Sequence, residues 1–103
     1  MDADERIEKL SRAADWRAAF TILTAAFPRD QRVWRHVDFE REEIHFKTML
    51  RNGTFSSGER TLLEVAASLF NRRHSVNLWE VFNKLDEVNA ALVLRAIEKF
   101  CSS

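Results

Sequence analysis

Apolar residues recur along most of this chain at intervals of three and four, the spacing that is typical of one face of a helix. An early run consists of Trp16, Phe20, Leu23 and Phe27. A shorter run, from Ile7 to Ala14, precedes it, and the two runs could form one long helix or two helices in succession. Pro28 ends the pattern, because the residue before a proline disfavours the helical backbone conformation.

The second half of the chain contains three further helical segments, at residues 56–70, 77–85 and 86–101. In the first of these, Ser56 and Glu59 have the spacing of a capping box, in which each side chain satisfies a free backbone N–H of the other residue. Either Asn77 or Ser75 can cap the second of these segments and Asp86 can cap the third, since Asn, Ser and Asp commonly cap helices. These local signals predict where each helix begins.

Residues 29–37 fit two structures. Their apolar side chains suit one helical turn, whereas the alternation of Val37, Asp38 and Phe39 also suits a short extended segment. Asp38 is expected to cap the next helix, which ends at Gly53. Gly53 is expected to adopt the left-handed backbone conformation that often terminates helices.

The composition supports a helical fold. The chain has only two Gly and one Pro, whereas an all-β domain needs many turns rich in these residues. Its 103 residues are the usual size of one domain. The sequence therefore predicts an all-α fold, a single domain over residues 1–103 that forms a compact bundle of five or six short helices.

Charge and cysteine content bear on the cellular setting. The 16 basic residues balance the 16 acidic ones, so the net charge provides no long-range attraction to nucleic acid or to an anionic membrane. A single Cys excludes an intramolecular disulfide and is typical of a reducing compartment. The charged first residues do not fit a signal peptide, and no apolar run approaches the roughly 20 residues that span a bilayer. We expect a cytoplasmic protein without a membrane segment.

Three stretches contain residues of possible chemical interest. Residues 55–63 resemble the signature loop of the transporter ATPases, but the chain has no P-loop, and a capped helix start explains the same residues. Glu42 and His45 have the spacing of a di-iron ligand pair without a second such pair, so a solvated helix face is expected. Cys101 has no neighbouring His and lies where chains usually fray. We expect no cofactor, no metal and no enzymatic activity.

Arginine and tryptophan residues provide the candidate interaction surface. Arg and Trp are the residue types that dominate the binding energy of protein interfaces. The candidate residues are Arg29, Arg32, Trp34, Arg35, Arg72 and Arg73. Trp34 is either partly exposed for a partner or covers the edge of the core. The expected function is a non-enzymatic protein-interaction or structural module, whose partner is another protein or a second copy of the chain in a homodimer.

Nucleic-acid binding is the alternative function. Basic clusters at residues 29–35 and 72–74 could contact phosphates. However, the acidic residues at 38–43 follow the first cluster closely and would repel a nucleic-acid backbone. Together with the balanced net charge, this disfavours nucleic acid as the partner.

Overall fold

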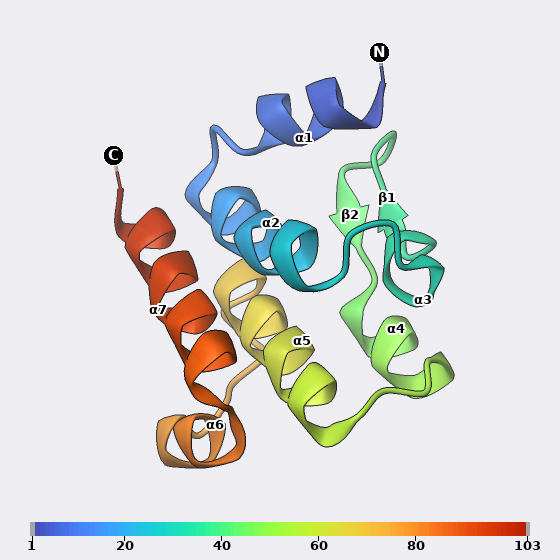
Figure 1. Ribbon diagram of the computed structural model, residues 1–103. Helices are drawn as coiled ribbons and strands as arrows, with labels where there is room; N and C mark the ends of the chain where they lie inside the picture. The colour runs from blue at the N-terminus through green and yellow to red at the C-terminus, as the bar shows by residue number, and fades with distance from the viewer. Residues whose placement is uncertain (1, 103) are drawn as a thin grey trace.

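The computed structural model describes residues 2–102, which form seven helices and one two-stranded sheet (Figure 1). The predicted all-α class is confirmed. The helices outnumber the expected five or six because the two early apolar runs form separate helices and residues 31–34 form a short helix of their own. The helices are α1 (Ala3–Leu10), α2 (Ala14–Ala26), α3 (Gln31–Trp34), α4 (Phe46–Asn52), α5 (Ser57–Phe70), α6 (Leu78–Lys84) and α7 (Glu87–Cys101). The strands are β1 (Val37–Asp38) and β2 (Glu43–Ile44).

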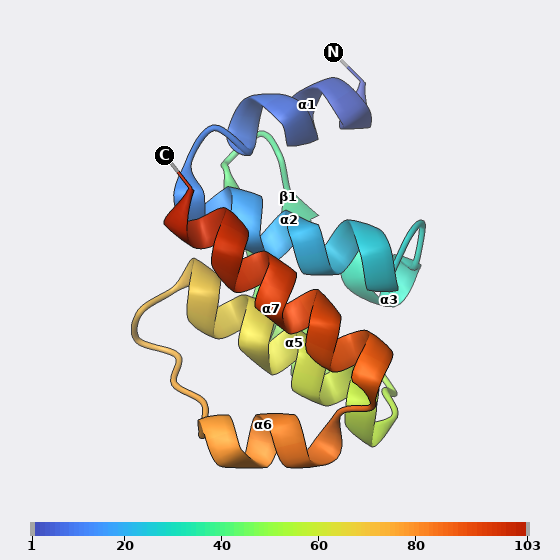
Figure 2. The ribbon, with the colours of Figure 1, turned by 60° about the vertical axis from the view of Figure 1, so that its left-hand side comes forward.

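The core lies where α2 packs against both α5 and α7 (Figures 1 and 2). Each of these three helices contributes a fully buried alanine, namely Ala19, Ala66 and Ala96. Small side chains at helix contacts allow the helix axes to approach closely. The remaining elements surround this central group.

Within residues 2–102, no helix has both the length and the apolar character needed to cross a bilayer.

The predicted starts of the last three helices are confirmed by their caps. The Ser56 hydroxyl accepts a hydrogen bond from the backbone N–H of Glu59 (3.2 Å), and the Glu59 carboxylate accepts one from the backbone N–H of Ser56 (2.9 Å). The side chains of Asn77 and Asp86 accept hydrogen bonds from backbone N–H groups in the first turns of α6 and α7. These contacts satisfy donors that a helix start leaves unpaired.

The prediction that a helix begins after Asp38 is wrong for the first part of this segment, which forms a hairpin. Asp38 ends β1, which pairs antiparallel with β2 so that Val37 lies opposite Ile44. The Asp38 carboxylate accepts a hydrogen bond from the backbone N–H of Arg41 (3.1 Å), as Asp residues commonly do in turns. The hairpin buries Val37 and Ile44, and α4 begins only at Phe46.

Two further expectations about this region are corrected. Glu42 lies in the hairpin turn with a positive φ of 55°, and His45 precedes α4, so the two residues do not share a helix face. Gly53 has φ −85° and ψ 147°, which is an extended conformation and not the left-handed one. A Cβ atom there would lie 2.6 Å from Cζ of Phe55, so any larger residue would require the Phe55 ring to shift.

Candidate functional site

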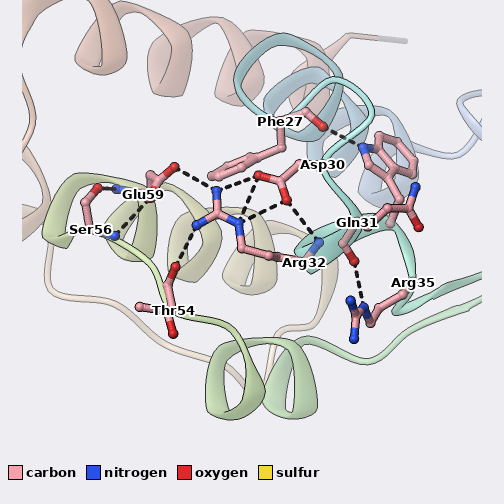
Figure 3. A network of polar contacts seen from close by, with 9 residues as sticks. Phe27, Asp30, Gln31, Arg32, Arg35, Thr54, Ser56 and Glu59 are labelled. Atoms are coloured by element: carbon pink, nitrogen blue, oxygen red, sulfur yellow. Dashed lines mark hydrogen bonds and ion pairs between the residues drawn. The ribbon is translucent and has the colours of Figure 1, made fainter.

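Arg32 makes the densest set of polar contacts in the predicted interaction surface (Figure 3). Its guanidinium pairs with the carboxylates of Asp30 (2.6 Å) and Glu59 (3.1 Å). It also donates a hydrogen bond to the Thr54 carbonyl oxygen (2.6 Å) and lies over the Phe55 ring, 4.7 Å from its centroid. Arg32 thus connects the segment before α3 to the start of α5, and its charge is balanced within the chain.

The same contacts hold the two carboxylates in their ionised form. The hydrogen bond from the Arg32 side chain lowers the pKa of Asp30 below its ordinary value. The backbone N–H of Ser56 lowers the pKa of Glu59, and Arg32 lowers it further. Because hydrogen bonds to a carboxylate favour its charged form, this network is complete at neutral pH.

We expect Arg32→Gln to reduce the acid sensitivity of the fold. A carboxylate whose pKa is lower in the folded chain stabilises the fold above its unfolded pKa, near pH 4, and loses that contribution as the pH falls through the folded pKa. Removing the Arg32 charge should therefore destabilise the protein more at pH 7 than at pH 3. Urea unfolding of both proteins at the two pH values measures the difference.

Arg72→Gln provides the control for this measurement, because the Arg72 side chain is exposed and makes no ion pair or hydrogen bond within residues 2–102. The Arg72→Gln variant should keep the pH dependence of the wild-type protein. An equal loss of stability at pH 7 and pH 3 in Arg32→Gln would show that Arg32 does not hold these two carboxylates in their ionised form (Figure 3).

Trp34 is half-buried and fixed by the chain on several sides. Its indole Nε1–H donates a hydrogen bond to the Phe27 carbonyl oxygen (2.6 Å). Its ring stacks against Phe20 and Phe39, with centroid distances of 6.0 and 6.5 Å. Buried Trp side chains usually satisfy their N–H in this way. Trp34 therefore packs at the edge of the core, with part of its ring left accessible.

The remaining predicted arginines are distributed over separate clefts. Arg29 and Trp34 line a cleft of about 610 Å³ that also contains Asp2 and Asp4. Arg35 lines a smaller cleft with Arg32. The structure therefore does not place Arg29, Arg32 and Arg35 on one uninterrupted cationic stripe.

Arg72 and Arg73 are exposed in the loop that follows α5. Arg73 and Lys47 of α4 both line a third cleft, whereas Arg72 lies outside it. Adjacent arginines in one loop thus have different surroundings, and the six predicted residues are not gathered in a single site.

Four of the exposed large apolar side chains lie on α6 and at the start of α7, and the sequence analysis did not identify them. The exposed fractions are 64% for Leu78, 73% for Trp79, 38% for Phe82 and 78% for Val88, and we call these four residues the α6 surface. Figure 2 shows α6 crossing the end of the α5 and α7 pair, far from the N-terminus. Only Val81 of α6 is buried among the described residues.

Helix geometry contains a signal for this surface. Successive residues of an α-helix are separated by about 100°, so two positions separated by one residue point to nearly opposite sides. Trp79 and Val81 are such a pair, and only one of them can face the core. Because Val81 is the buried residue, Trp79 is directed toward solvent.

The side chains that bind metals in proteins do not gather in the described part of the chain. Within residues 2–102, no three His, Cys, Asp or Glu side chains are arranged to hold a metal ion. Cys101 is a free, exposed thiol at the end of α7. Comparison of the chain with protein families, with curated proteins and with solved structures finds no match to any of them.

Proposed function

We propose that this protein is a non-enzymatic interaction module that pairs with a second copy of itself through the α6 surface. The observation that carries the proposal is the exposure of Trp79, at 73%, between Leu78 and Phe82. Contiguous exposed apolar patches are typical of interaction sites. Trp is also among the residues that contribute most to binding energy when a partner covers it.

A second copy of the chain can cover the α6 surface. Leu78, Trp79 and Phe82 lie on one side of α6, because helix positions separated by three and four residues share a face. Two such faces can pack against each other about a twofold axis, which is the commonest form of self-association.

Trp79→Ser is expected to weaken the dimer at least about 30-fold, because loss of an interface hot spot costs about 2 kcal/mol or more. Light scattering over a dilution series measures the dissociation constant directly. Leu94→Ser is the matched control, since Leu94 is an exposed apolar residue of α7 outside the α6 surface. It should leave the dissociation constant nearly unchanged.

Glu80→Lys tests which side of α6 forms the contact. Glu80 is two positions from both Leu78 and Phe82 and therefore points to the opposite side of the helix, so this substitution should leave the dissociation constant nearly unchanged. A wild-type protein that stays monomeric at every concentration would contradict the proposal. Equal effects of Trp79→Ser and Leu94→Ser would also contradict it.

Nucleic-acid binding has less support than self-association. The charge of Arg32, in the middle of the 29–35 cluster, is balanced by Asp30 and Glu59. Arg73 of the 72–74 cluster lines a different cleft from Arg32 and Arg35. A nucleic-acid backbone would need several free cations in a continuous row.

A further inference from the structure

We propose that a second site, the cleft between α4 and the end of α5, binds a small phosphate monoester with an aromatic or similar ring body. The cleft has a volume of about 390 Å³, within the range of small-molecule sites. The first residues of α4 form one side, and the end of α5 with its following loop forms the other. This proposal is independent of self-association through the α6 surface.

The lining of the cleft is cationic. Its ionisable side chains are Lys47, Arg73, His45 and His74, and no carboxylate residue lines it. Within residues 2–102, the side chains of Lys47 and Arg73 take part in no ion pair and no hydrogen bond, and the backbone N–H of Arg73 donates to the Asn71 side-chain oxygen (3.0 Å). His45 pairs with Glu43 (3.3 Å), which lies outside the lining. Lys47 and Arg73 therefore retain their full charge for a ligand, in contrast to Arg32.

The chemistry of these two cations favours a phosphate. The planar guanidinium of arginine can donate two parallel hydrogen bonds to phosphate oxygens, and the lysine ammonium provides a compact positive charge. A phosphate monoester carries nearly two negative charges at neutral pH, which Lys47 and Arg73 together would balance. Thr48 and Asn71 also line the cleft and can contribute further hydrogen bonds.

An apolar wall next to the cations favours a ligand with a ring. Phe46, Ala67 and Phe70 line the cleft, and the two ring centroids are 5.8 Å apart. Phe46 and Ala67 are buried and Phe70 is half-buried, so the Phe70 ring provides the accessible part of this wall. A bare phosphate ion would leave this wall in contact with water. A ring joined to the phosphate would cover it and add hydrophobic binding energy.

Titration of ¹⁵N-labelled protein with phenyl phosphate tests the proposal. We expect shifted amide resonances confined to residues 44–48 and 67–74, and weaker binding of inorganic phosphate. Arg73→Ala should raise the dissociation constant about 10-fold or more, since a hydrogen bond to a charged group contributes about 1.5–3 kcal/mol. Arg72→Ala is the matched control, because Arg72 is adjacent and exposed but outside the cleft. It should change the constant less than about 2-fold, as a purely screened surface charge does.

Several outcomes would overturn the proposal. One is the absence of localised shifts with phenyl phosphate, and another is an equal loss of binding in Arg72→Ala and Arg73→Ala, which would indicate diffuse charge attraction. Equally tight binding of inorganic phosphate would exclude the role of the apolar wall. Tighter binding of single-stranded oligodeoxythymidine, with shifts beyond the cleft, would replace the small ligand with nucleic acid.

Discussion

Phe27→Ala is expected to lower the free energy of unfolding by about 3–5 kcal/mol, the usual cost of removing a buried phenyl ring. Phe27 is the C-cap of α2 and is only 2% exposed. Its ring meets the Phe55 ring edge to face at 6.2 Å, and its carbonyl oxygen accepts the hydrogen bond from Trp34. Without the ring, the alanine variant would leave a cavity between α2 and the segment that precedes α5.

Urea unfolding followed by circular dichroism measures this loss. It would remove a large part of the roughly 5–15 kcal/mol that stabilises a typical domain. Phe27→Leu should be less destabilising, because it fills most of the same volume. Phe100→Ala is the control for an exposed ring, at the end of α7. A loss in Phe27→Ala no larger than in Phe100→Ala would contradict the central place given to Phe27.

The helical part of the fold could be predicted because its signals are local. The capping box of Ser56 and Glu59 lies within four consecutive residues, and the caps at Asn77 and Asp86 each act on the following turn. Such contacts join residues that are close in the sequence, so a sequence pattern can reveal them. The helix boundaries in the second half were therefore predictable from the sequence.

The segment around Asp38 shows where local signals fail. An Asp residue can cap a helix or accept a hydrogen bond in a turn, and its sequence neighbours do not decide between these. Here the pairing of Val37 with Ile44 decides, because the hairpin buries both side chains. The outcome depends on a packing contact that the sequence pattern does not contain.

The candidate sites were less predictable than the fold because they depend on distant partners. The sequence predicted a basic cluster at residues 29–35, yet Arg32 of this cluster pairs with Glu59, 27 positions away. The cationic cleft likewise joins Lys47 to Arg73 across the α4 and α5 contact. The separation of Trp79 and Val81 by one residue indicates that only one of them faces the core, and the packing of α6 decides that this is Val81.

Leu63→Ala and Leu78→Ala are expected to separate the residues that fold the chain from those that we propose to bind its partner. Leu63 of α5 is fully buried and Leu78 of α6 is 64% exposed. Leu63→Ala should lower the free energy of unfolding by about 2–5 kcal/mol, whereas Leu78→Ala should change it by less than about 0.5 kcal/mol. The free energy of unfolding should be measured at protein concentrations below the dimer dissociation constant, because dimerisation itself stabilises the folded chain.

Leu78→Ala should instead weaken the dimer in the dilution series, and Leu63→Ala should affect dimerisation only through its loss of folded protein. If Leu78→Ala destabilises the monomer as much as Leu63→Ala does, the α6 surface contributes to folding and its exposure has another cause. If the two effects separate as expected, α6 retains a large apolar surface that the isolated fold does not need. A surface of this kind is stable in water only at a cost in solubility, which a second copy of the chain removes by covering it.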